Sequence, residues 1–174
     1  YQEHSISELR ESLMRGERPV LSAPTGAGKT RIASEIFSLA RARHRRVVFV
    51  VPFLSLINQT WKAFVEAGID EREIGIIQAN HPLTDYSRPV QIASIDTLVR
   101  RPKLPETDIV IFDECHKQSK VHERWMMTAP DTWFIGLSAT PWARGMDALW
   151  SRMIIVSTLA ELIDQGYLSP FKYF

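Results

Sequence analysis

The segment Ser22-Ala-Pro-Thr-Gly-Ala-Gly-Lys-Thr30 combines the residue types that hold a polyphosphate. A loop that wraps phosphates needs small residues where backbone N–H groups point inward, a cation for the β and γ oxygens, and a hydroxyl for Mg²⁺. The segment meets this pattern at every position but the first, where Ala23 replaces glycine. The candidate nucleotide-binding residues of the loop are Pro24, Thr25, Gly26, Ala27, Gly28, Lys29 and Thr30.

An unrelated turn rich in glycine and proline is the alternative, and the flanking residues argue against it. Val20-Leu21-Ser22 has the composition of a short buried strand. Thr30 is expected to open a helix whose apolar face is formed by Ile32, Ile36, Leu39 and Ala40. Strand, loop and helix in this order are the setting that a phosphate-binding loop requires.

A pair of carboxylates follows a second apolar run, Ile109–Phe112. An acid directly after a strand lies at the carboxyl end of the sheet, where doubly wound sheets bind ligands. Asp113 is therefore a candidate Mg²⁺ ligand together with Thr30, and Glu114 is a candidate base for the attacking water. An isolated Asp-Glu pair is more often a solvated turn, but the phosphate-binding loop earlier in the chain favours the metal site.

The next two residues, Cys115 and His116, do not form a catalytic dyad. Neighbours on an extended segment point to opposite sides, so adjacency in sequence does not bring the two side chains together. The single cysteine and the scattered histidines also lack the spacing of a zinc site. We expect Cys115 to be a packing residue, while His116 is either a bridge to neighbouring motifs or a polar turn residue.

The elements that position these residues indicate an α/β fold. Ser5 and Glu8 match a capping box, and Gly16 is placed to end the helix that they would begin. A further helix is expected from about Ser55 to Ala67, before Gly68. These helices alternate with apolar runs at 47–51, 74–77, 90–93, 109–112 and 133–137. Alternation of this kind predicts a mostly parallel, doubly wound sheet flanked by helices.

Composition suggests one domain in a reducing compartment. A chain of 174 residues that is 45% hydrophobic can bury one sizeable core. It carries a net charge of +1, so a nucleic-acid partner would need a local basic patch. With one cysteine, no apolar run long enough for a membrane and no signal peptide, we expect a soluble, cytoplasmic protein without a membrane partner.

Three ordered motifs resemble those of a known superfamily. Ala23 to Thr30, Asp113-Glu-Cys-His116 and Ser138-Ala-Thr140 look like motifs I, II and III of superfamily-two helicases and translocases of the DEAD/DEAH-box type. Tyr1-Gln2 resembles the end of an element that precedes motif I in the branch of type III restriction ATPase subunits and excision-repair helicases. Cys115 occupies the third place of the box, which leaves the DEAD or DEAH subgroup open.

The resemblance implies a RecA-like, P-loop domain that uses ATP and Mg²⁺, with a role for each matching residue. Gln2 would read the adenine edge, with Tyr1 packing nearby. Lys29, Asp113 and Glu114 would be catalytic, with Lys29 on the phosphates, Asp113 and Thr30 on Mg²⁺, and Glu114 as the base. Ser138, Thr140 and His116 would couple the nucleotide state to the nucleic-acid path.

In this superfamily nucleic acid crosses the loops of motifs Ia to Ic, and DNA is the expected track rather than RNA. By position, the candidate contacts are Pro52, Phe53, Ser55, Asp96, Thr97 and Arg100. Arg100 and Arg101 are equally well explained as a solvated helix end. The basic run 41–46 is better explained that way, because cations favour a helix C-terminus.

The resemblance also implies a partner domain. We expect a RecA-like domain at 1–157, then a terminal helix at 158–174 that begins a linker to a second RecA-like domain in the same longer chain. Arginines from a second domain assist hydrolysis in related systems, so the isolated chain is expected to be inactive. The alternatives are a regulatory nucleotide-binding domain or a small-molecule phosphotransferase, although the latter has no need of Ser138-Ala-Thr140.

Overall fold

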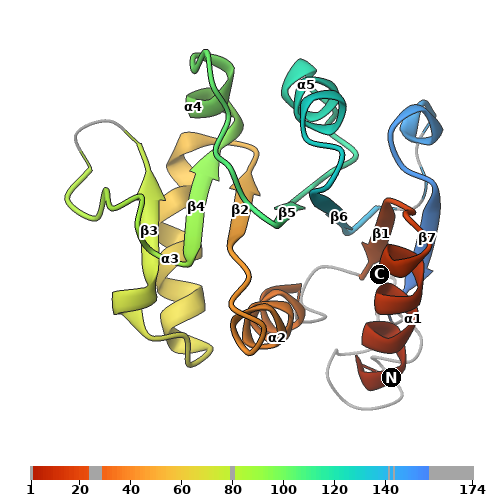
Figure 1. The fold of residues 1–174 in the computed structure, drawn as a ribbon, viewed down its shortest axis with the longest axis horizontal. Coiled ribbons are helices and arrows are strands. Elements are labelled where there is room, and N and C mark those ends of the chain that lie inside the picture. Colours follow the sequence, from red (N-terminus) through yellow and green to blue (C-terminus); the bar gives the residue numbers. More distant parts are fainter. Residues whose placement is uncertain (1, 24–28, 79–80, 141, 143, 157–174) are drawn as a thin grey trace, which may run out of the picture.

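The computed structural model describes residues 2–23, 29–78, 81–140, 142 and 144–156, which form one parallel sheet with helices on both faces (Figure 1). The sheet has seven strands in the order β3-β4-β2-β5-β6-β1-β7, and every pair is parallel. The strands are β1 (Pro19–Ser22), β2 (Val47–Val51), β3 (Ile74–Ile77), β4 (Val90–Ser94), β5 (Ile109–Phe112), β6 (Trp133–Ser138) and β7 (Arg152–Ile155). The expected doubly wound α/β fold is confirmed.

Two groups of helices cover the sheet. The α-helices are α1 (Gln2–Met14), α2 (Lys29–Arg41), α3 (Ile57–Glu66), α4 (Ile95–Val99) and α5 (Lys120–Thr128). Short 3₁₀ helices occur at Leu54–Leu56, Glu71–Glu73 and Met146–Ala148. Leu9, Ile36 and Phe64 from α1, α2 and α3 share one hydrophobic core, whereas Leu98 and Trp125 from α4 and α5 belong to the core on the opposite face.

The strands are continuous apolar runs because both of their faces are covered. All five residues of β2 are buried, as are all four of β5. On the α1–α3 face, the rings of Phe37, Phe49 and Phe64 pack edge to face, with centroids 4.9 Å apart for two of the three pairs. The central strands are therefore held rigidly, which fixes the positions of the residues at their carboxyl ends.

Two local predictions need correction, and one strand was not predicted. The capping box expected at Ser5 is wrong, because α1 already begins at Gln2 and Ser5 is a buried residue inside the helix. A Ser and a Glu three positions apart also occur within helices, and serine is small enough for a packed face. Leu39 is 42% exposed and lies outside the apolar face of α2 that Ile32 and Ile36 form. Strand β7 was not predicted.

Other boundaries agree with expectation. Gly16 and Gly68 have φ of 73° and 92° and follow α1 and α3, as helix-ending glycines do. No helix in the described part of the chain is long and apolar enough to cross a membrane. Residues 158–174 lie outside the described residues, so the terminal helix and the proposed domain boundary stay predictions.

Candidate nucleotide site

The carboxyl ends of β1, β5 and β6 bring the three motifs together. In the sheet Ser22 of β1 lies opposite Ser138 of β6, and Phe112 of β5 lies opposite Gly136. Beyond the strands, the N–H of Ala23 donates to the carbonyl of Ser138 at 3.0 Å. The N–H of Cys115 donates to the carbonyl of Leu137, also at 3.0 Å. Main-chain hydrogen bonds thus tie motifs I and II to the end of the strand that carries motif III.

Lys29 joins the phosphate-binding loop to the carboxylate pair. It is the first residue of α2, and its ammonium group forms an ion pair with Oε1 of Glu114. The same Nζ lies 3.5 Å from Oδ1 of Asp113. All three side chains are largely buried, at 18–25% exposure, so solvent screens these charges less than it would at the surface. One cation therefore faces two adjacent anions.

The electrostatics of Asp113 suit a cation ligand. Burial raises the pKa of its carboxyl above the usual range, and the attraction of Lys29 works in the opposite direction. The N–H of Glu114 donates to Oδ1 of Asp113 at 3.0 Å, which orients the carboxylate. A second positive charge beside Asp113 would favour its ionised form further.

Glu114 adopts a left-handed backbone conformation with φ of 49°, which is uncommon for a residue with a side chain. Strained conformations of this kind cluster at functional sites, where the surrounding structure holds them. The turn that begins here carries the chain from β5 back toward β6, so that Cys115 reaches the carbonyl of Leu137. The Glu114 carboxylate consequently faces Lys29 instead of solvent.

These residues fit a Mg²⁺ ion that is shared with phosphates. Mg²⁺ in phosphate sites takes one or two protein oxygens and completes its shell with water and phosphate oxygens. Asp113 offers such an oxygen beside the start of α2, where Thr30 follows Lys29. Among the residues that the structure describes, no group of three or more His, Cys, Asp or Glu side chains could hold a metal without other ligands.

His116 connects the carboxylates to the third motif. Its Nδ1 lies 3.3 Å from Oε2 of Glu114 and 3.2 Å from Oγ of Ser138. The Ser138 hydroxyl also accepts from the N–H of Thr140 at 3.1 Å. Of the two interpretations of His116, this geometry agrees with the bridge, and the coupling role of these three residues stays a prediction.

Cys115 is a packing residue, as expected. It is fully buried, and burial raises the pKa of its thiol to about 12, with a further contribution from the carboxylates of Glu114 and Asp113. A Cβ atom on Gly136 of the neighbouring strand would stand 2.6 Å from Sγ of Cys115. The two residues fit together only because position 136 has no side chain.

The predicted nucleic-acid residues lie at the same carboxyl edge. Phe53, which follows β2, is 50% exposed, and Ser55 and Arg100 are also exposed, whereas Pro52 is buried. The carboxylate of Asp96 accepts from the N–H of Leu54 at 3.0 Å, so it fixes the loop after β2. The Thr97 N–H donates to Ser94, which caps α4.

Sequence reasoning did not single out Lys117, whose ammonium lies 5.2 Å from the centroid of the ring of Phe53, a predicted nucleic-acid residue. Its position directly after motif II, at the end of β5, was the available signal. Other predicted residues are not placed. Residues 24–28 lie outside the described residues, and so does the side chain of Gln2.

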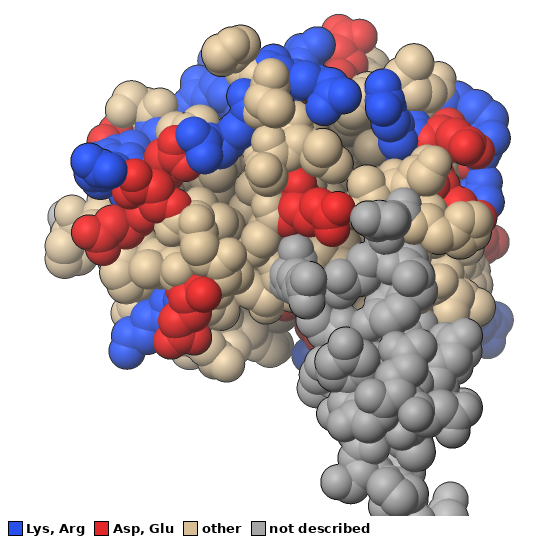
Figure 2. Space-filling model, turned by 90° about the horizontal axis from the view of Figure 1, so that it is seen from below, with Lys and Arg blue, Asp and Glu red and all other residues tan. Residues whose placement is uncertain are grey.

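The face of the molecule in Figure 2 carries both signs of charge. On the face that Figure 2 shows, Lys and Arg gather mainly along one margin, with Asp and Glu among them. Within the basic run, Arg41 and Arg45 form ion pairs with Glu73 and Asp108, which agrees with a solvated helix end. Any attraction of nucleic acid therefore depends on local clusters.

Comparison with known proteins gives a consistent set of matches. Residues 1–143 match the family model described as type III restriction enzyme, res subunit. A 51.5 kDa protein of a Lactococcus phage is 26% identical, with 89% of this chain and 32% of that protein covered. The ATP-dependent DNA helicase Hel308 of Aeropyrum pernix is 30% identical, and the match covers 82% of this chain and 21% of the helicase.

Solved structures share the fold. The Hef helicase domain of Pyrococcus furiosus superposes with a TM-score of 0.72 at 19% identity, and the match covers 99% of this chain and 40% of that chain. The UvsW helicase of bacteriophage T4 gives a TM-score of 0.70 at 20% identity and covers 84% of this chain. The chain thus spans a minor part of the curated relatives and of the Hef structure.

Proposed function

The chain belongs to the family of type III restriction enzyme res subunits, and from this we propose that it is the ATP-binding domain of a helicase or translocase that moves along nucleic acid. The observation that carries the proposal is the contact of Lys29 with both Asp113 and Glu114, which joins the phosphate-binding loop to a carboxylate pair. Relatives described as ATP-dependent helicases support it.

Each residue has a distinct task in this proposal. Lys29 leaves the carboxylates and neutralises phosphate oxygens when a triphosphate occupies the loop. Thr30 and Asp113 would hold Mg²⁺, which supplies charge stabilisation for the transferred phosphoryl group. Glu114, released from Lys29, is then free to accept a proton from water. The ion pair between Lys29 and Glu114 therefore prevents the Glu114 carboxylate from acting as a base until a nucleotide binds.

The link to nucleic acid runs through motif III. His116 contacts both Glu114 and Ser138. A movement of Glu114 would therefore shift His116 and change its contact with Ser138 at the end of β6. The segments after β2 and β4 lie on the same edge, where Phe53 follows β2, Asp96 lies in the first turn of α4 and Arg100 ends this helix. We propose that these segments contact the backbone of the strand and that DNA is the preferred track.

The test is ATP hydrolysis by the whole protein in the presence of single-stranded DNA, double-stranded DNA and RNA. We expect hydrolysis that depends on Mg²⁺ and rises with nucleic acid, most strongly with DNA. Lys29→Ala should abolish it, because the phosphates lose their cation. Hydrolysis that no nucleic acid stimulates would count against a motor, and nucleotide binding without any hydrolysis would indicate a regulatory domain.

A further inference from the structure

The sheet face opposite α1–α3 has a gap in its helical cover. Parallel strands are usually joined by a helix that packs on the sheet, yet the described residues of the β3–β4 connection, 78 and 81–89, contain no helix. Figure 1 shows this connection as a loop beside β3. Together with the segment 101–107 before β5, it covers the part of this face around Val48 and Gln91, while Leu98 of α4 packs in the same core near Val50 and Ala93.

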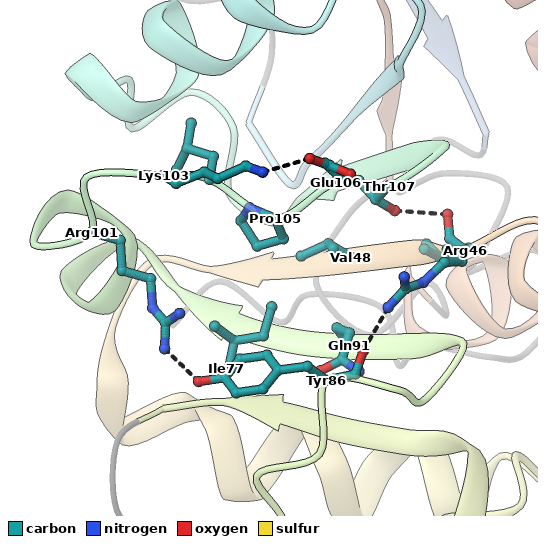
Figure 3. Close-up of a pocket in the computed structure, with 12 residues that line it drawn as sticks. Arg46, Val48, Ile77, Tyr86, Gln91, Arg101, Lys103, Pro105, Glu106 and Thr107 are labelled. Carbon is teal, nitrogen blue, oxygen red and sulfur yellow. Dashed lines mark hydrogen bonds and ion pairs between the residues drawn. The ribbon is translucent and has the colours of Figure 1, made fainter.

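A pocket of about 400 Å³ lies in this gap. Its floor includes Val48 of β2, Gln91 of β4 and Ile77 of β3, and its walls come from the two loops. Figure 3 shows Arg46 and Arg101 at opposite ends of the pocket, both directed toward Tyr86. The nucleotide site is formed by other residues, at the carboxyl ends of β1, β5 and β6.

The lining of the pocket is positively charged. It contains Arg46, Arg101 and Lys103 against one carboxylate, Glu106, which pairs with Lys103 at 2.6 Å. Within the described part of the chain, neither arginine side chain forms an ion pair with a carboxylate. Two guanidinium groups are therefore available to an anion.

Both arginines are held in place by one aromatic residue. The guanidinium of Arg46 donates to the carbonyl of Tyr86 at 2.6 Å, and that of Arg101 donates to its hydroxyl at 2.8 Å. Arg101 also lies 5.4 Å from the centroid of the ring. Tyr86 nevertheless remains 48% exposed, so part of its surface is free for a ligand.

A buried amide adds a second sign of a ligand. Gln91 is only 4% exposed, and its Nε2 donates to the carbonyls of Asp85 and Arg88. Its Oε1 has no hydrogen-bond donor in the described structure. Buried acceptors without a partner are rare in proteins, and the N–H groups of a nucleobase or a bridging water are donors that could satisfy this one.

We propose that the pocket is a second nucleic-acid site, which takes one nucleotide of a single strand with its phosphate on the arginines and its base beside Tyr86. Basic grooves with exposed aromatic rings are the usual means of binding single strands. Arg101 follows Arg100, a predicted contact at the carboxyl edge, whereas Arg46 directly precedes β2. A strand that binds at the carboxyl edge and runs along this face of the sheet would therefore meet Arg101 first and Arg46 last. The proposal rests on the proposed function in that it assumes a nucleic-acid partner.

The experiment measures binding of a fluorescent oligo(dT) strand to the whole protein by anisotropy at several salt concentrations. Replacing Arg46 and Arg101 together by alanine should weaken binding about tenfold and lower the salt slope by about 0.7 for each phosphate that is no longer neutralised. Tyr86→Ala should also weaken binding about tenfold, because the base can no longer stack, but lower the slope less than the double variant does, because both arginines keep their charge. Arg43→Ala is the matched control, since Arg43 is an exposed arginine outside this pocket.

Unchanged affinity and slope in the double variant would overturn the proposal, as would an equally weakened Arg43→Ala, which would mean that only bulk charge matters. Competition by inorganic phosphate or thymidine monophosphate at concentrations near the strand's own would overturn it in favour of a small-anion site. Thermal melting shows whether each variant is folded. Stimulation of ATP hydrolysis in the unchanged protein reports separately on the proposed function.

Discussion

The nucleotide site and the basic pocket hold their charges in opposite ways. At the nucleotide site the cation Lys29 meets two carboxylates, so the charged groups satisfy one another without a ligand. In the pocket Arg46 and Arg101 donate hydrogen bonds to the neutral oxygens of Tyr86, so no carboxylate balances their positive charge. The first site must therefore rearrange when phosphate binds, whereas the second is already prepared for an anion.

The two sites also differ in how they are built. The nucleotide site uses residues at the ends of buried strands, where the sheet fixes their positions within the register of β1, β5 and β6. The pocket is made by loops that replace a helix. Rigid strand ends suit the exact placement that phosphoryl transfer requires. Loops can accommodate different bases, which suits binding of a single strand without sequence preference.

The largest expected effect separates the chemistry from binding. Glu114→Gln removes the proposed base but keeps the size of the side chain, so turnover of the whole protein should fall roughly 10² to 10⁴-fold. Nucleotide affinity should persist, because Lys29 still reaches the phosphates. ATP hydrolysis and nucleotide binding are measured together, with Glu66→Gln, an exposed residue at the end of α3, as the control. Unchanged turnover would remove Glu114 from the base role.

The next effect is a dependence of the free energy of unfolding on pH, which we expect from His122, a residue outside the basic pocket. His122 is buried at the start of α5, its ring stacks on Phe112, and its Nδ1 accepts from the Ser119 N–H at 3.1 Å. Burial lowers the pKa of His122 to about 4 from 6.5. Above pH 6.5 this residue is neutral in both folded and unfolded chains.

As the pH falls from 6.5 to 4, the unfolded chain gains a proton that the folded chain resists. The free energy of unfolding should therefore drop by up to about 3 kcal/mol over this window. Denaturant titrations at pH 7 and pH 4.5 measure the drop, and His122→Gln should reduce it while His44→Gln, at an exposed site, should not. Equal pH sensitivity in His122→Gln and the unchanged protein would contradict the assignment.

Alanine substitutions at two glycines test the packing beside the nucleotide site, at Gly136, and beside the pocket, at Gly75. Alanine at Gly136 would place Cβ 2.6 Å from Sγ of Cys115, and alanine at Gly75 would place it 2.2 Å from the carbonyl oxygen of Asp85. Each substitution should lower the free energy of unfolding by about 1–3 kcal/mol. Chemical denaturation measures both.

Rescue should differ between the two positions. Adding Cys115→Ala to Gly136→Ala removes the obstructing sulfur and should restore part of the missing stability. For Gly75→Ala the obstruction is main chain, so Gln91→Ala should not restore it and removes two hydrogen bonds besides. Equal rescue at both positions would mean that the loop over Gly75 is freely displaced and that the pocket wall is not fixed.

Much of the nucleotide site could be predicted from sequence because its residues follow apolar strands in ordered motifs. The matches to helicase relatives confirm the resemblance that these motifs carry. Strand β7 was missed although Met153-Ile154-Ile155 is an apolar run. It is an edge strand that pairs with β1 alone, and of its four residues only Ile154 is buried.

The pocket could not be predicted at all. Arg46, Tyr86 and Arg101 come from three separate loops, and no spacing in sequence relates them. Only the absence of a helix from the described residues between β3 and β4 brings them together. The contact between Lys117 and Phe53 could not be predicted either, because it depends on β2 and β5 being neighbours in the sheet.

The smallest expected effect compares Lys117 at the carboxyl edge with Arg46 and Arg101 in the pocket. Lys117 lies at the carboxyl edge over the ring of Phe53, a predicted nucleic-acid contact, so its ammonium is placed beside a strand that crosses this edge. Lys117→Ala should therefore weaken binding of every strand by a few fold and lower the salt slope by about 1, as removal of a lysine from one phosphate does. Anisotropy with oligonucleotides of mixed sequence measures this, with Lys62→Ala, an exposed lysine on α3, as the control.

Strand length then sharpens the difference between the two regions. If a strand crosses the carboxyl edge before it reaches the pocket, Lys117→Ala should weaken binding of short and long oligonucleotides alike, because both occupy the edge. The Arg46 and Arg101 substitutions should matter only once the strand is long enough to continue past Arg100. A length dependence shared by both sets of variants would instead place Lys117 and the pocket in a single binding surface.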